Sequence, residues 1–123
     1  EEGLENRINR HRKCAEAFYL GLEALGFTPF ADGNSRSNVV IAVNYLPGID
    51  DKQFRELIST KFKVLIAGGF GELKGKVFRV GSMGEVSSYH VMRTLSAISS
   101  SMSILGVQPI KDGLSVANKI LNQ

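Results

Sequence analysis

The mainly apolar positions of the chain repeat with two periods, and each period predicts one type of secondary structure. Near the N-terminus they recur every three or four residues, the spacing that lines one face of an α-helix. This face comprises Leu4, Ile8, His11, Ala15, Phe18, Leu22 and Leu25. Gly26 follows directly and is a typical helix end. The pattern predicts a helix of about 33 Å. Such a helix is longer than a small core needs, so its first two turns either pack against something outside this chain or fray.

Shorter apolar runs bounded by turn residues predict strands. Residues 39–45 are apolar on both faces, as expected of a strand that is central or covered twice. Residues 27–30 form a short extended segment, which Pro29 limits to a sheet edge because proline has no N–H to donate. Residues 64–67 predict a short buried strand, and residues 76–81 a further one. Together these runs predict a sheet of three to four strands.

Three further helices are expected later in the chain. Asp50 and Gln53 form a variant of the capping box ahead of a second apolar stripe. Ser87 is a good N-cap for a helix that runs to about Leu105, and a last short helix is expected around residues 114–121. The order α-β-β-α-β-β-α favours an α+β fold, with a mainly antiparallel sheet and helices packed on one face.

One arginine, Arg79, lies in the middle of a short apolar strand bounded by glycine-rich turns. Because successive side chains of a strand point to opposite faces, Phe78 and Val80 share one face, which is expected to be the core face. Arg79 lies on the other face between Val77 and Gly81. An arginine in this position can present its donors to a carboxylate or a phosphate. The alternative is an ordinary strand arginine whose charge lies in water.

The glycine-rich loop ahead of this strand does not follow a nucleotide-binding pattern. Residues 68–75 have the wrong glycine spacing for a dinucleotide fingerprint, and they precede a strand, whereas that fingerprint opens a helix. The chain contains no Gly-Lys-Ser or Gly-Lys-Thr, so a P-loop is excluded. We interpret this segment as a loop that borders a site.

Composition and charge narrow the class of protein. The 123 residues, 43% hydrophobic and 22% charged, fit one globular domain. Wholly apolar runs reach only about five residues, so neither a signal peptide nor a membrane span is expected. The single cysteine, Cys14, allows no intrachain disulfide, and with only His11 and His90 beside it no zinc site is expected. This cysteine use is compatible with a reducing cytoplasm.

Two other classes of protein stay open at this point. Short strands and two helices could form a ferredoxin-like regulatory module that binds a free amino acid, although that fold has the order βαββαβ and no long first helix. A basic module that binds nucleic acid is the other class, and the mild net charge of +3 does not call for it. The basic cluster near the N-terminus lacks a dense stripe with exposed aromatics. It comprises Arg7, Arg10, Arg12 and Lys13.

The order of motifs along the chain resembles a known family. Residues 2–7 (EGLENR) open the first helix, residues 66–71 read IAGGFG, and residues 75–84 read GKVFRVGSMG. This series resembles the small C-terminal domain of class V aminotransferases, of the serine–pyruvate and alanine–glyoxylate type, which use pyridoxal phosphate. The resemblance covers residues 2–106 and implies the α+β small domain of a fold-type I transferase.

The resemblance implies a transaminase whose chemistry lies outside this chain. In the family, the Schiff-base lysine, the acid paired with the pyridine nitrogen and the phosphate cradle belong to a large domain upstream. None of the lysines here stands in the family's Schiff-base context: Lys13, Lys52, Lys61, Lys63, Lys74, Lys76, Lys111 and Lys119. By position only Arg79 carries over, as the residue that binds the substrate α-carboxylate. We therefore expect no catalytic, cofactor-binding or metal-ligating residue in this chain, and pyridoxal phosphate bound by the large domain.

The resemblance also implies a place in a larger enzyme. Residues 1–123 would be a single C-terminal small domain without the large domain, with residues 1–26 as its opening helix and residues 107–123 as a C-terminal extension. The expected partners are the large domain of the same polypeptide and a second copy in a homodimer, with no nucleic acid or membrane. The expected substrates are alanine, serine or aspartate and the 2-oxo acids glyoxylate or pyruvate, in the cytoplasm.

Overall fold

The computed structural model describes residues 3–29, 40–64, 66–69, 75–81 and 88–122. The expected N-cap Ser87 and most of the glycine-rich loop lie outside these residues. The elements are α1 (Leu4–Leu25), β1 (Thr28–Pro29), β2 (Val40–Asn44), α2 (Asp51–Phe62), β3 (Ala67–Gly68), β4 (Val77–Gly81), α3 (Ser88–Ile104) and α4 (Gly113–Leu121). Their order confirms the predicted succession of helices and strands.

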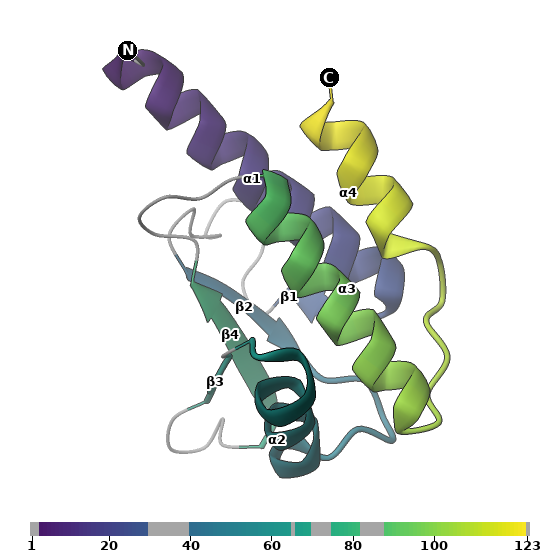
Figure 1. The fold of residues 1–123 in the computed structure, drawn as a ribbon. Helices are drawn as coiled ribbons and strands as arrows, with labels where there is room; N and C mark the ends of the chain where they lie inside the picture. The colour runs from purple at the N-terminus through teal and green to yellow at the C-terminus, as the bar shows by residue number, and fades with distance from the viewer. Residues whose placement is uncertain (1–2, 30–39, 65, 70–74, 82–87, 123) are drawn as a thin grey trace.

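The strands form one antiparallel sheet in the order β1-β2-β4-β3. β2 and β4 lie in the middle and pair along their whole length, from Val40 opposite Gly81 to Asn44 opposite Val77. β1 carries Pro29 at one edge, as predicted, and β3 forms the other edge. Figure 1 shows α1, α3 and α4 gathered on one side of this sheet. The fold is therefore the predicted α+β arrangement, with helices on one face.

The core lies between the sheet and the helices. Phe78 and Val80 of β4 are buried in it, together with Ile41 and Val43 of β2, so the predicted core face of the arginine-bearing strand is confirmed. Four aromatic rings join the sheet to α2, with neighbouring centroids 5.1–6.5 Å apart in tilted and edge-to-face pairs. These rings belong to Phe27, Tyr45, Phe54 and Phe78.

The first helix has the predicted length, and its two ends have different surroundings. α1 ends at Gly26, whose φ of 121° is readily adopted only by glycine. Its second half is buried in the core through residues such as Phe18 and Leu22, whereas Leu4 near its start is 73% exposed. Figure 1 shows this start of α1 extending past the sheet. The predicted stripe is therefore buried only where the other helices and the sheet cover it, and the side chains of Ile8 and His11 lie outside the described part.

The expected buried strand over residues 64–67 is wrong in position and in burial. The strand there is β3, which comprises only Ala67 and Gly68, and Ala67 is exposed. Val64 is buried, but it follows the left-handed C-cap Lys63 of α2, and its N–H donates to the Ile58 carbonyl at 3.3 Å. The run is apolar because Val64 packs at the end of a helix, and a short apolar run does not distinguish that role from a strand.

Candidate functional site

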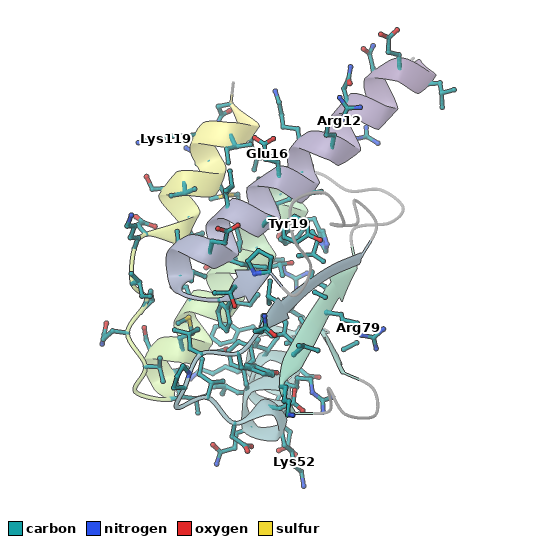
Figure 2. The ribbon with its side chains drawn as sticks, turned by 180° about the vertical axis from the view of Figure 1, so that it is seen from behind. Arg12, Glu16, Tyr19, Lys52, Arg79 and Lys119 are labelled. Carbon is teal, nitrogen blue, oxygen red and sulfur yellow. The ribbon has the colours of Figure 1, made fainter. Side chains whose placement is uncertain are left out.

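Arg79 stands between two alanines on the face of the sheet that the helices leave uncovered. In the register, Arg79 of β4 is directly opposite Ala42 of β2 and Ala67 of β3. Directly opposite residues point to the same face, so the arginine is flanked on both sides by a methyl group. Figure 2 shows Arg79 projecting from the sheet on the side away from the helices. The two residues that flank Arg79 across the strands, Ala42 and Ala67, therefore both have small side chains.

A hydrogen bond to the edge strand holds the guanidinium in place. The Nε–H of Arg79 donates to the carbonyl oxygen of Gly68 at 3.0 Å, and the side chain is half-buried. Anchoring through Nε fixes the plane of the guanidinium. The pair of terminal amino groups in that plane is the part of an arginine that matches a carboxylate with two parallel bonds. A planar anion such as a carboxylate would be bound by these terminal groups and not by Nε.

A second guanidinium lies on the other side of Gly68. Arg55 of α2 packs so closely that a Cβ built on Gly68 would lie 3.2 Å from the Cζ atom of Arg55 and 3.3 Å from its Nε atom. Arg55 also borders a hollow of about 290 Å³, lined in addition by Lys52, Glu56, Ser59 and Ile66. Gly68 is thus in contact with Arg55 through its α-carbon and with Arg79 through its carbonyl oxygen.

Asp51, one helical turn before Arg55, fixes this second guanidinium. Nε of Arg55 donates to both carboxylate oxygens of Asp51 at 3.1 Å, and Nη2 donates to Oδ2 at 2.8 Å. The hydroxyl of Tyr45 donates to Oδ1 of Asp51 at 2.6 Å. Burial, and then this hydrogen bond, raise the pKa of Tyr45, while the bonds to Asp51 raise the pKa of Arg55. The three side chains form one charge-assisted network at the start of α2.

The sequence analysis singled out Arg79 and did not mark Asp51 or Arg55, which the structure brings close to it through Gly68. The signal that was available is their spacing, since an acidic and a basic residue four positions apart on a helix face each other. That spacing predicts the ion pair but not its position against Gly68, which depends on how α2 packs on β3.

The described lysines do not fit a covalent pyridoxal-phosphate site. A lysine that forms a Schiff base is activated by a desolvated pocket or by a neighbouring cation. Lys13 is half-buried, Lys74 lies outside the described residues, and the other lysines are exposed. The exposed ones are Lys52, Lys61, Lys63, Lys76, Lys111 and Lys119.

The described cysteine and the possible metal-ligating side chains offer no further candidate for a reactive site. Cys14 is buried, and burial raises the pKa of its thiol, which makes it a poor nucleophile. Within the described ranges, no three His, Cys, Asp or Glu side chains are grouped so as to hold a metal ion. None of the helices in the described part of the chain is both long and apolar enough to span a bilayer.

Comparison with known proteins places these observations in a family. The chain is 40% identical over 121 residues to an uncharacterised aminotransferase of Methanocaldococcus jannaschii, covering 98% of this chain and 31% of the relative. It is also 40% identical over 84 residues to the (S)-ureidoglycine–glyoxylate transaminase of Bacillus subtilis, covering 68% of this chain and 20% of that protein. No protein-family profile matches the chain.

A solved structure agrees with the relatives found by sequence. The crystal structure of ureidoglycine–glyoxylate aminotransferase from Bacillus subtilis matches with a TM-score of 0.92 and 30% identity, over 99% of this chain and 32% of its own. A Synechococcus protein described as the small subunit of a soluble hydrogenase is also similar, with 30% identity over 94% of this chain and 30% of its own length. The chain spans between 20% and 31% of the curated relatives named here.

Proposed function

Since the chain belongs to the class V aminotransferase family, we propose that it is the small C-terminal domain of an enzyme that transfers an amino group from a small amino acid to a 2-oxo acid. Residues 1–26, which include α1, then open the domain, and residues 107–123 are its C-terminal extension. Relatives named for serine–glyoxylate and alanine–glyoxylate transfer support glyoxylate as the acceptor and serine or alanine as the donor. A pyridoxamine–pyruvate transaminase and an aspartate aminotransferase among the similar proteins support pyruvate and aspartate as the alternatives.

In this proposal Arg79 binds the α-carboxylate of the substrate. The observation that carries it is the row of Ala42, Arg79 and Ala67, in which an alanine lies on either side of the arginine in the register and its Nε is anchored on Gly68. A carboxylate held by two parallel bonds is fixed in position and in orientation. The amino group of the substrate is thereby aimed at one point in the cleft, which Arg79 shares with the rest of the enzyme.

We assign pyridoxal phosphate to a large domain of the same polypeptide, and the exposure of most described lysines, which does not fit a Schiff-base site, supports this assignment. When bound, the cofactor supplies the electron sink that amino transfer requires. The residues of this chain bind and orient the substrate and close one side of the cleft. We further propose that the whole protein is a cytoplasmic homodimer, in which the exposed start of α1, including Leu4, packs against protein outside this chain.

Amino transfer by the full-length protein tests this function. With pyridoxal phosphate present, serine and aspartate are each offered with glyoxylate or with pyruvate, alanine is offered with glyoxylate, and the glycine or alanine formed from the acceptor is measured. We expect turnover with at least one donor, and no turnover with the carboxylate-free amines ethylamine and ethanolamine. Absence of transfer from every donor, with the cofactor demonstrably bound, would contradict the proposal.

A further inference from the structure

We propose that Asp51 and Arg55 position Arg79 through the backbone of Gly68, and so set the affinity for the substrate carboxylate without touching the substrate. This inference rests on the proposed function of Arg79. It assigns a role to an ion pair on α2 that the motifs of the sequence do not mark.

The acceptor that anchors Arg79 belongs to a strand with little support of its own. β3 comprises only Ala67 and Gly68 and lies at the edge of the sheet, so it is paired on one side only, with β4. Two ladder positions hold a strand weakly, and an edge strand gains nothing from a second neighbour. The position of the Gly68 carbonyl therefore depends on what packs against β3 from outside the sheet.

Arg55 supplies that packing. Its guanidinium lies against the α-carbon of Gly68, where a Cβ would meet Cζ at 3.2 Å, Nε at 3.3 Å and Nη2 at 3.4 Å. For this added Cβ the first two distances are tighter than an ordinary van der Waals contact and the third is ordinary, so the guanidinium packs over the glycine and would have to shift by a few tenths of an ångström for a side chain there. Gly68 is consequently held between the guanidinium of Arg55 and the Nε–H of Arg79.

Asp51 makes Arg55 rigid enough for this role. An arginine side chain has many rotamers, and fixing it in one of them costs conformational entropy. Here the carboxylate accepts from both Nε and Nη2 of Arg55, and it is itself held by the Tyr45 hydroxyl. The side chain of Asp51 is 11% exposed against 37% for Arg55, so the network is anchored on its buried side. Tyr45 and Asp51 thus hold Arg55 by hydrogen bonds, and Arg55 packs on Gly68. The Gly68 carbonyl in turn holds Nε of Arg79.

A double-mutant cycle in the full-length holoenzyme tests the inference. Arg55→Gln, Arg79→Ala and the double variant are compared with wild type through kcat/KM and KM for the amino donor, with the cofactor absorbance as a check on the rest of the site. If Arg55 acts through Arg79, Arg55→Gln raises KM about 5- to 20-fold on the wild-type background and changes it by less than about twofold on the Arg79→Ala background. Arg55→Lys retains the charge but not the plane, and recovers only part of the loss.

Two further variants keep the cycle decisive. Lys61→Gln removes an exposed positive charge from the same helix and should leave KM within about twofold of wild type. Gly68→Ala perturbs the contact without removing the ion pair, and should raise KM in the same direction by a smaller factor. It serves as the test if Arg55→Gln does not fold.

The outcomes separate this inference from the proposed function. If Arg79→Ala lowers kcat/KM but the effect of Arg55→Gln is equal on both backgrounds or absent, the positioning role is wrong and the role of Arg79 stands. A fall in melting temperature with unchanged KM would give Asp51 and Arg55 a purely structural role and likewise overturn the inference. If Arg79→Ala itself has no effect, the proposed function is wrong, and the inference with it.

Discussion

Gly113 at the start of α4 contacts Gly21 of α1 so closely that a Cβ at position 113 would overlap the Gly21 carbonyl oxygen. The same Cβ would lie 2.7 Å from Cγ of Leu25, and a Cβ at position 21 would lie 3.2 Å from the Gly113 carbonyl oxygen. The absence of both side chains lets α4 approach α1, and Figure 1 shows the two helices side by side. The C-terminal segment is therefore packed into the domain through a pair of glycines.

Gly113→Ala should destabilise the domain because the backbone of α1 cannot move away cheaply. Overpacking of this kind costs typically about 1–3 kcal/mol of unfolding free energy, measurable as a lower midpoint in urea. Ser115→Ala is the matched control, since Ser115 is an exposed residue of the same helix and its substitution should stay within about 0.5 kcal/mol of wild type. Equal midpoints for the two variants would show that α4 does not depend on this contact.

The N-terminus of α2 depends on the predicted cap. Oδ2 of Asp50 accepts from the N–H of Gln53 at 3.0 Å, which confirms this half of the predicted capping box. Asp50→Ala should lower the free energy of unfolding by about 1 kcal/mol, and Asp50→Ser should recover most of that loss. Denaturation of the three proteins at pH 7 measures both values. A Ser variant as unstable as the Ala variant would argue against capping as the cause.

The bond between Tyr45 and Asp51 gives the domain a pH dependence at alkaline pH. The folded state raises the pKa of Tyr45, so this contribution to stability is fully present below the unfolded pKa of about 10 and declines as pH rises above it. Tyr45→Phe should cost about 1–2 kcal/mol at pH 7, because it removes a partner of a buried carboxylate. The difference from wild type should shrink between pH 10 and pH 11 in urea unfolding. A difference that grew over this range would have the wrong sign for the account.

Much of the fold could be predicted from local patterns in the sequence. The three- and four-residue spacing of α1, the cap at Asp50 and the edge position of Pro29 follow from rules that involve only neighbours in the chain. The same holds for the two faces of β4, because alternation along a strand separates Phe78 from Arg79 wherever the strand lies.

What could not be predicted depends on contacts between distant segments. Ala42 and Ala67 flank Arg79 because of the register in which β4 pairs with β2 on one side and with β3 on the other. The packing of Arg55 on Gly68 depends on where α2 lies relative to the edge strand β3. The sequence shows only an acidic and a basic residue four positions apart, a spacing that also occurs on exposed helices with no such contact. For the same reason the short apolar run that begins at Val64 predicted a strand, whereas Val64 packs at the end of α2.

The central claim is that Arg79 anchors the substrate carboxylate, and kcat/KM of the full-length Arg79→Ala holoenzyme for its amino donor tests it most directly. We expect a fall of ~10²–10⁴, equivalent to about 3–5 kcal/mol of transition-state stabilisation, with partial recovery in Arg79→Lys and an unchanged cofactor spectrum in both. Arg93→Ala is the control, because Arg93 is an exposed arginine of α3 that donates long hydrogen bonds of 3.4 and 3.3 Å to the carbonyls of Phe62 and Lys63 at the end of α2. It should retain wild-type kcat/KM. A near-normal kcat/KM for Arg79→Ala would contradict the account, and loss of the cofactor in that variant would reassign Arg79 to the cofactor phosphate.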